Sequence, residues 1–291
     1  MKKKHTLLLG AHISIADSLE KAFERGESIG CTTIQIFTKS NRQWYAKPIT
    51  QEQADLFKFT YKSSTIKPVV VHASYLINLC SPDQDTEKKS ITALIEELER
   101  CEQLGISLLV LHPGSHGKNT QEDGLQKIIT NIDYALEHAK SSTQIALEIM
   151  AGQGTQTCST FERLSYVINS SRYKDRLGVC FDTCHAFAAG YDFRDTKSYS
   201  QLWSDFDDII GLEKLKVIHV NDSKKECGSH IDRHENIGKG ELGLEPFRLL
   251  FNDKRFFDIP KILETPGDDL NDYAQNMTII THLISPENKT T

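Results

Sequence analysis

The chain has 291 residues, of which 38% are hydrophobic and 25% charged; this predicts a globular protein with a sizeable core, and no apolar stretch approaches the roughly 20 residues needed to span a membrane. The formal net charge of −6 argues against a protein that holds nucleic acid by bulk positive charge. Seven scattered cysteines without a CxxC pair indicate reduced thiols and therefore a cytoplasmic location.

Short apolar runs recur along the chain, and each is followed by a longer stretch, many of them with helical periodicity. The runs span Thr6–Ala11, Thr33–Phe37, Pro68–Val71, Ser107–Leu111, Gln144–Ile149, Leu177–Phe181, Leu215–Val220 and Pro260–Leu263. Between them, Thr86–Leu104 and Gln121–Lys140 carry apolar residues at helical spacing, and Gly105 provides a helix stop. Eight strands alternating with helices predict a single α/β domain over residues 1–291, a closed (β/α)8 TIM barrel with extended loops on its C-terminal face. The polar residues 285–291 are expected to form a frayed tail. An open doubly wound sheet is the alternative, but no GxGxxG motif follows the first strand.

Seven of the eight runs end on a side chain that can bind a metal ion. These side chains are His12, His72, His112, Glu148, Asp182, His219 and Glu264. A single histidine at a strand end is more often a hydrogen-bonded core residue, and a single glutamate is as readily part of a salt bridge. Together, however, the carboxylates would converge at one end of the barrel and repel one another unless cations neutralise them. The set therefore predicts a metal centre, with His12 outside the ligands.

A second cluster lies in the long segment Asn221–Gly243, where His230, Asp232 and His234 would point the same way in an extended conformation. With His185 they form a further ligand set, although a solvated charged loop is the alternative. Imidazole and carboxylate without thiolate suit Zn²⁺, with Mn²⁺ or Fe²⁺ as substitutes. The predicted ligands are His72, His112, Glu148, Asp182, His185, His219, Asp232, His234 and Glu264. Because catalytic sites keep open positions, this number favours three divalent ions, whose charge would cancel the formal −6.

With these residues identified, the chain closely resembles endonuclease IV, the zinc-dependent apurinic/apyrimidinic (AP) endonuclease family of DNA base-excision repair. The likeness runs from Gly10-Ala-His-Ile-Ser14 to Ile262-Leu-Glu-Thr265. It includes Phe37-Thr-Lys-Ser-Asn-Arg-Gln-Trp44, His72-Ala-Ser-Tyr-Leu-Ile-Asn78, His112-Pro-Gly-Ser115, Asp182-Thr-Cys-His-Ala186, His219-Val-Asn-Asp222 and Asp232-Arg-His234. So many motifs in order, on a matching barrel, are highly specific.

The resemblance implies three zinc ions, held by His72, His112 and Glu148, by Glu148, Asp182, His219 and Glu264, and by His185, Asp232 and His234. It implies hydrolysis of the phosphodiester on the 5′ side of abasic sites in double-stranded DNA, leaving a 3′-hydroxyl and a 5′-deoxyribose phosphate. Glu148 and Glu264 are then the catalytic carboxylates, with Glu148 orienting or deprotonating the attacking water. Arg42, Tyr75 and Leu76 match family positions that push into the duplex. We expect a monomer without a membrane partner.

Further basic residues follow the second and seventh strands and are expected to contact DNA on the same face as the metal centre, with ordinary solvated loop charges as the alternative. They are Lys39, Lys224, Lys225, Arg233 and Lys239. The sequence departs from the family in two places: Ala73 stands where the family usually has Asp, and Ile149 and Met150 stand where it usually has Asn-Thr. None of these residues is a predicted ligand, but neighbours of ligands orient them and tune the metal.

Two other functions fit part of the pattern. A sugar isomerase or epimerase on the same barrel also places carboxylates and histidines at its strand ends, but it would leave Asp232, His234 and the Arg42 loop without a role. A noncatalytic protein stabilised by metal would fill its open coordination positions with protein groups.

Overall fold

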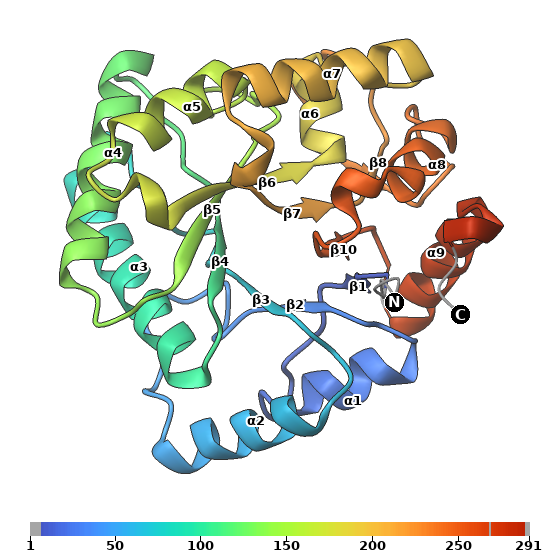
Figure 1. Cartoon of the computed structure of the whole chain (residues 1–291). Helices are drawn as coiled ribbons and strands as arrows, with labels where there is room; N and C mark the ends of the chain where they lie inside the picture. Colours follow the sequence, from blue (N-terminus) through green and yellow to red (C-terminus); the bar gives the residue numbers. More distant parts are fainter. Residues whose placement is uncertain (1–6, 268, 289–291) are drawn as a thin grey trace.

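A computed structural model describes residues 7–267 and 269–288, in which the strands form an inner ring surrounded by helices (Figure 1). The strands are β1 (Leu9–Ala11), β2 (Ile34–Ile36), β3 (Val69–His72), β4 (Leu108–Leu111), β5 (Gln144–Glu148), β6 (Leu177–Asp182), β7 (Leu215–His219), β8 (Asp222–Ser223), β9 (His234–Glu235) and β10 (Lys261–Leu263). The helices are α1 (Lys21–Ser28), α2 (Gln51–Ser63), α3 (Gln84–Leu104), α4 (Gln121–His138), α5 (Phe161–Ser170), α6 (Thr183–Ala189), α7 (Thr196–Ile209), α8 (Glu245–Asn252) and α9 (Leu270–Leu283). Short 3-10 turns cover Lys174–Arg176, Leu212–Lys214, Lys254–Phe256 and Pro286–Asn288.

Eight parallel strands pair in the order β1-β10-β7-β6-β5-β4-β3-β2 within the described residues. The ring closes between β1 and β2, where His12 and Gln35 form a parallel bridge and the amide of Ile13 donates to the carbonyl of Gln35 over 2.8 Å. Gly10 permits this approach, because a Cβ atom on it would collide with the carbonyl oxygen of Thr33. The predicted (β/α)8 barrel is confirmed, and the open sheet is not what forms.

Helix ends follow local capping. Helix α3 begins before its predicted start because the side chain of Asp83 accepts a hydrogen bond from the amide of Thr86 over 2.8 Å. It ends as predicted at Gly105, whose φ of 71° few other residues adopt at low cost. Helix α4 begins at the predicted residue, behind the cap of Thr120, and ends slightly early, at His138.

The last described residues pack on α8. The amide of Ser285 donates to Oδ1 of Asn252 over 2.8 Å, and the side-chain amide of Asn288 donates to the same atom over 3.1 Å. The start of the tail that we expected to fray is therefore held in place. Residues 289–291, and Thr6 at the start of the first predicted strand, lie outside the described residues.

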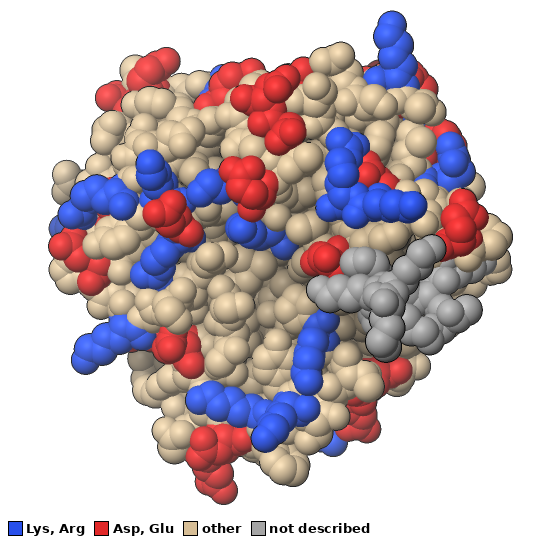
Figure 2. All heavy atoms as spheres, in the orientation of Figure 1, with Lys and Arg blue, Asp and Glu red and all other residues tan. Residues whose placement is uncertain are grey.

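The surface carries charges of both signs. On the face shown in Figure 2, Lys and Arg side chains are interspersed with those of Asp and Glu. None of the described helices is both long and apolar enough to cross a bilayer. All seven cysteines are unpaired, as their number and spacing predicted.

Candidate metal centre

Alternation along the strands places six predicted ligands in one layer of the barrel. A small cluster of buried side chains fills the interior: Val70, Val110, Ala146, Cys180, Val217 and Ile262. Side chains two residues apart on a strand point to the same face. The next inward residues, toward the carboxyl ends of these strands, are His72, His112, Glu148, Asp182, His219 and Glu264. The apolar layer therefore forms the floor beneath a polar layer at the C-terminal face, where barrel active sites lie.

The first group consists of His72, His112 and Glu148, whose candidate ligand atoms all lie within 4.8 Å of one another. Both histidine Nε2 atoms are 3.2 Å from Oε2 of Glu148. The Nδ1 of His72 donates to the carbonyl oxygen of Ala73 over 2.7 Å, which leaves Nε2 free to act as a ligand. His72 and Glu148 are buried and His112 is half-buried, so the group opens to solvent beside His112.

The second group consists of Glu148, Asp182, His219 and Glu264, again within 4.8 Å of one another. The Nδ1 of His219 lies 3.3 Å from Oε1 of Glu148, 3.3 Å from Oε2 of Glu264 and 3.7 Å from Oδ2 of Asp182. Three carboxylates thus surround one imidazole nitrogen in a buried layer. Such an arrangement is stable only when cations offset the repulsion among the carboxylates.

The third group consists of His185, Asp232 and His234. The Nε2 of His185 lies 3.1 Å from Oδ2 of Asp232, and the Nε2 of His234 lies 3.4 Å from Oδ1 of the same residue. His185 sits in the first turn of α6, directly after β6, and His234 begins β9, which pairs with β8 in a short antiparallel ladder. The loop after β7 therefore folds back over the barrel and brings Asp232 and His234 to His185, as predicted.

Several of these atoms are buried and make no hydrogen bond, although each lies within 3.4 Å of another candidate ligand atom. They are Oε1 of Glu148, Nε2 of His185, Nδ1 of His219 and Nε2 of His234. A buried polar atom without a partner costs roughly 1–3 kcal/mol, so four of them in one place indicate that a bound species completes the site. Imidazole nitrogen and carboxylate oxygen are the donors that Zn²⁺ and related divalent ions accept. The residues present therefore fit divalent metal ions.

Electrostatics within the centre support the same conclusion. Burial alone would raise the pKa of Glu148, but the facing imidazoles of His219 and His112 outweigh it and hold that pKa well below its usual range. Burial opposes charge on His185 too, yet the carboxylates of Asp182 and Asp232 raise its pKa well above the ordinary value. Asp232 is likewise opposed by burial, but His185 lowers its pKa to about 2. Ionised carboxylates thus face protonated imidazoles, and divalent ions would take the place of those protons.

Two buried amides that the sequence reasoning missed hold the carboxylates in place. The Asn221 side chain donates to Oδ2 of Asp182 over 2.7 Å and accepts from the backbone amide of Glu264 over 2.9 Å. The Gln35 side chain contacts His219, Glu264 and His12. Asn221 stands within the His219-Val-Asn motif, and Gln35 is a long polar residue in an apolar run, so each carried a signal that could have been used.

A cleft of about 450 Å³ opens above the centre. It is lined by Tyr75, His112, Gln156, His185, Asp232, Arg233, His234 and Glu264. Solvent therefore reaches ligand atoms of the first and third groups and one carboxylate of the second. The other members of the second group, Glu148, Asp182 and His219, are buried beneath the cleft.

Comparison with known proteins gives the family. The chain is 49% identical over 263 residues to a protein named "Probable endonuclease 4" from Trichlorobacter lovleyi, a match that covers 90% of this chain and 94% of that protein. The chain belongs to the endonuclease IV family. The crystal structure of endonuclease IV from Thermus thermophilus matches it with a TM-score of 0.83 and 32% identity, over 94% of this chain and 98% of that one. The resemblance inferred from the motifs is thereby confirmed, and the chain is an endonuclease, a hydrolase of phosphodiester bonds.

The endonuclease IV barrel belongs to a wider group of similar folds. A family model described as "Xylose isomerase-like TIM barrel" matches residues 23–283. The crystal structure of a D-tagatose 3-epimerase-like protein matches the chain with a TM-score of 0.71 at 17% identity, covering 94% of this chain and 96% of that one. At this identity the likeness concerns the fold alone, so it carries no sugar chemistry to this chain.

The departures from the family motifs leave the histidine orientation intact. His72 is oriented by the backbone carbonyl of Ala73, and the Nδ1 of His185 lies 3.0 Å from the backbone carbonyl of Ile149. Because backbone oxygens make these contacts, the side chains at both positions can change without removing them. The side chains of Ala73, Ile149 and Met150 are buried.

The residues predicted to enter the duplex lie beside the centre. The ring of Tyr75 is half exposed, at 51%, and its centroid lies 5.2 Å from that of His72 and 5.5 Å from that of His112. Arg42 is exposed and Leu76 is half-buried. The hydroxyl of Ser74 donates to the carbonyl of Asn41 over 3.0 Å, which joins the loop that carries Arg42 to the loop that carries Tyr75.

Two expectations about basic and histidine side chains are wrong. Lys39 does not face the surface: its side chain is only 2% exposed, and Nζ lies 3.4 Å from Glu96 and 3.9 Å from Glu97 on α3. His230 does not align with Asp232 and His234, because its φ of 54° breaks the extended conformation and its Nδ1 contacts the carbonyl of Ala151. The remaining predicted basic residues are exposed: Lys224, Lys225, Arg233 and Lys239.

Proposed function

We propose that this endonuclease hydrolyses the phosphodiester on the 5′ side of an abasic nucleotide in duplex DNA, leaving a 3′-hydroxyl and a 5′-deoxyribose phosphate, and that it holds three zinc ions. The observation that carries the proposal is the convergence of unpartnered buried ligand atoms in three adjoining groups, the first two of which share Glu148. Its free thiols favour a reducing compartment, so we propose that it acts in the cytoplasm. We also propose that it acts as a monomer.

Each group would hold one ion. His72, His112 and Glu148 would hold the first, Glu148, Asp182, His219 and Glu264 the second, and His185, Asp232 and His234 the third. Bound Zn²⁺, or Mn²⁺ or Fe²⁺ in its place, supplies Lewis acidity and lowers the pKa of water at neutral pH. With Glu148 shared, the first two groups adjoin, and the third group borders the cleft through His185, Asp232 and His234.

The carboxylates contribute the protein's own part of the chemistry. Glu148 stays ionised, and its Oε1 makes no hydrogen bond although it lies 3.3 Å from Nδ1 of His219, so this carboxylate would orient an attacking water and accept its proton. Glu264 lines the cleft through a side chain that is 11% exposed, so a scissile phosphate in the cleft would lie beside this carboxylate, with Glu148 buried beneath it.

The loops beside the cleft would hold the DNA. Tyr75 and Leu76 follow His72 closely in the chain, so a wedge inserted into the duplex would also deliver the abasic nucleotide to the first group. Arg42 lies on the adjoining loop, and Arg233 lines the cleft itself. These few positively charged side chains beside the cleft, and not the net charge of the chain, would bind the DNA phosphates.

The sugar isomerase or epimerase alternative is less favoured by the geometry. Sugar chemistry at the first two groups would leave the third group, closed by Asp232 and His234, without a function. A noncatalytic metal-stabilised protein would have protein groups on the open side, but a cleft of about 450 Å³ lies there instead.

A metal count combined with a nicking assay tests the proposal. The protein, purified without chelator, is expected to contain three zinc ions and to nick an oligonucleotide duplex at a single tetrahydrofuran abasic analogue, leaving an undamaged duplex intact. His112→Ala and Glu264→Gln are each expected to lower kcat/KM by about 100-fold or more, because they remove several kcal/mol of transition-state stabilisation. His138→Ala on α4, an exposed histidine, is the matched control. Wild-type cleavage by either ligand variant after zinc reloading would show the assignment to be wrong.

A further inference from the structure

Strand β2 supplies Gln35 to the interior of the barrel. Gln35 is fully buried, and each polar atom of its side chain has a partner. Its Oε1 accepts from Nε2 of His219 over 2.9 Å, and its Nε2 donates to Oε1 of Glu264 over 2.7 Å and to Nδ1 of His12 over 3.0 Å. One amide therefore joins two members of the second group to a residue that directly follows β1.

The orientation of this amide follows from its neighbours. As a ligand of the second ion, the carboxylate of Glu264 can only accept hydrogen bonds, so the atom that faces it must be the Gln35 nitrogen. The Gln35 oxygen then faces His219, whose Nε2 must carry a hydrogen to bond with it. Reversing the amide would place an oxygen against the carboxylate of Glu264 and an N–H group against the N–H of His219, so the orientation is fixed.

We propose that Gln35 is a positioning residue for the second ion. By holding the hydrogen of His219 on Nε2, it leaves Nδ1 as the ligand atom, and Nδ1 is the atom that lies among the carboxylates of Glu148, Glu264 and Asp182. By occupying Oε1 of Glu264, it leaves Oε2, 3.3 Å from Nδ1 of His219, as that residue's ligand oxygen. The inference rests on the proposed function, because it assumes an ion in the second group.

His12 completes the arrangement. Its Nδ1 accepts the second N–H of Gln35 over 3.0 Å and lies 3.3 Å from Oε1 of Glu264, and its ring centroid lies 4.2 Å from that of Phe37. His12 and Gln35 are also the residues that close the barrel through their parallel bridge. The seam of the barrel and the second group are thus tied together by one side chain, and Gln35 itself does not line the cleft.

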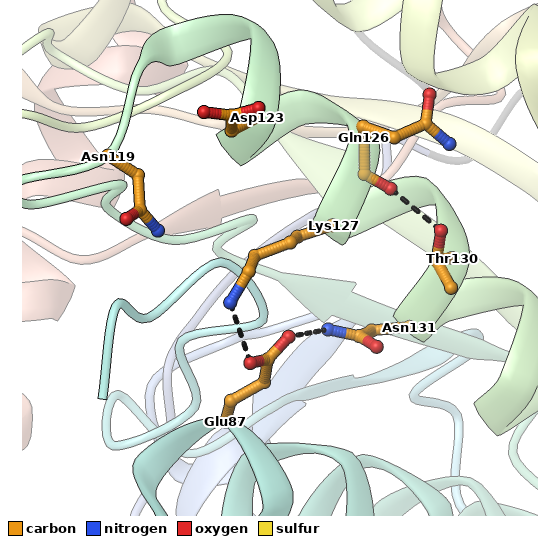
Figure 3. A pocket seen from close by; sticks show the side chains of 7 residues that line it. All are labelled: Glu87, Asn119, Asp123, Gln126, Lys127, Thr130 and Asn131. Carbon is orange, nitrogen blue, oxygen red and sulfur yellow. Dashed lines mark hydrogen bonds and ion pairs between the residues drawn. The ribbon is translucent and has the colours of Figure 1, made fainter. Parts of the chain in front are cut away.

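Two variants test the proposal, with a matched control. Gln35→Met keeps the size of the side chain and removes all three hydrogen bonds. Gln35→Glu keeps an acceptor for His219 but places a carboxylate against Glu264. Asn131→Leu controls for the general effect of removing a buried amide. The Asn131 side chain on α4 donates to Glu87 on α3 (Figure 3) and also to the carbonyl of Leu79.

The readouts are the zinc content of each purified protein, the rate of zinc release to a chelator, and the exchange-protected Nε2–H signal of His219 in the NMR spectrum of the zinc-loaded protein. Both Gln35 variants are expected to release one of three ions about 10-fold faster or more, with the other two released at the wild-type rate. The His219 signal is expected to persist in Gln35→Glu and to vanish in Gln35→Met, while Asn131→Leu leaves release and signal unchanged.

The outcomes separate this inference from the proposed function. If wild-type protein holds three ions and nicks abasic DNA but both Gln35 variants release all three at wild-type rates, the role of Gln35 is refuted and the function stands. Equal acceleration in Asn131→Leu would also refute it, because the effect would then be general. If the wild-type protein itself holds no ion in the second group, the proposed function fails first.

Discussion

The side chain of Asp182 caps the helix that carries His185: its Oδ1 accepts a hydrogen bond from the backbone amide of His185 over 2.8 Å. Its Oδ2 faces the other way, 3.7 Å from Nδ1 of His219 and 3.8 Å from Nε2 of His234. One carboxylate therefore starts α6, which positions a member of the third group, and is itself a member of the second. A substitution at Asp182 therefore affects the start of α6 and the candidate ion sites at the same time.

Substitutions at Asp182 are expected to separate these two roles. Asp182→Asn keeps an oxygen that can cap α6 but removes the charge, whereas Asp182→Ala removes both. In chelator-treated protein we expect Asp182→Ala to be about 1 kcal/mol less stable than Asp182→Asn, the usual contribution of an N-cap, and both variants to lose zinc. Urea denaturation of the metal-free proteins, with zinc content measured before chelation, checks this. Equal stability of the two variants would mean that the cap contributes nothing.

The response of stability to pH is expected to reverse on metal removal. Burial opposes charge on His185 and His219, but neighbouring carboxylates raise both pKa values well above the ordinary value. In metal-free protein the folded state therefore binds more protons than the unfolded state above about pH 6.5, so this stabilisation is complete below about pH 6.5 and is lost as pH rises through the raised pKa values. Bound zinc requires the same nitrogens deprotonated, so zinc binding strengthens as pH rises.

Melting temperatures between about pH 6 and 9, measured with zinc and with chelator, check this expectation. The chelated protein is expected to melt at lower temperature as pH rises through this range, and the difference between zinc-loaded and chelated protein is expected to widen. A difference that does not change with pH would show that the histidines do not exchange protons for metal. The comparison is made within one sequence, so other titrating groups contribute nearly equally to both curves.

The sequence allowed the ligand layer to be predicted because a strand offers only alternate residues to a barrel interior. Once the runs ending near His72, Glu148 and His219 are strands, their side chains must meet at one end. The same reasoning fails for His230, whose positive φ is set by contacts in the folded loop and is not typical of its residue type. Loops lack the periodicity that makes strands predictable.

Tertiary contacts also explain why Lys39 was wrongly expected at the surface and why Gln35 was missed. A lysine in a loop after a strand is usually solvated, and the burial of Lys39 depends on Glu97, which a separate helix brings to it. Gln35 is not a typical metal ligand, so a search for ligands passes over it. Its importance comes from the closure of β1 on β2, which places it beside both His219 and Glu264. Residues that support a site through tertiary contacts leave a weak signal in sequence.

Lys261 gives a further test, away from the metal centre. Its side chain is fully buried, with Nζ donating to the carbonyl of Ile259 over 2.8 Å, and burial lowers its pKa to about 7. Between pH 7 and about 10.5 the unfolded chain binds this proton and the folded chain does not, so this group makes stability rise with pH, by about 1.4 kcal/mol per unit at most. In Lys261→Met this rise is expected to disappear, so the stability of the variant relative to wild type should be greatest near pH 7 and fall by about pH 9.5. Urea denaturation of the zinc-loaded proteins at both pH values checks the sign, and a constant difference would contradict it.

We expect the loop that carries Arg42 to bind DNA. We also expect Arg100 on α3 to hold this loop in position. The guanidinium of Arg100 donates to Oγ1 of Thr38 over 2.9 Å and to the carbonyl of Lys47 over 3.0 Å, so it holds both ends of the loop. Arg42→Ala is expected to weaken binding to an abasic duplex and to flatten the dependence of log K on log salt by about 0.9, the share of one phosphate contact. Arg100→Ala is expected to weaken binding several-fold while the salt dependence changes little, because Arg42 keeps its charge and loses its position.

Fluorescence anisotropy over a salt titration, on zinc-loaded proteins with equal metal content, measures both effects. Arg172→Ala is the matched control, because this mostly exposed arginine precedes β6, at the opposite end of the barrel from the metal centre. It removes the same charge as Arg42→Ala and is expected to leave binding and salt dependence close to wild type. If Arg172→Ala lowers the salt dependence as much as Arg42→Ala does, net charge controls binding and the loop has no special part. If Arg100→Ala binds like wild type, Arg100 does not position the loop for DNA.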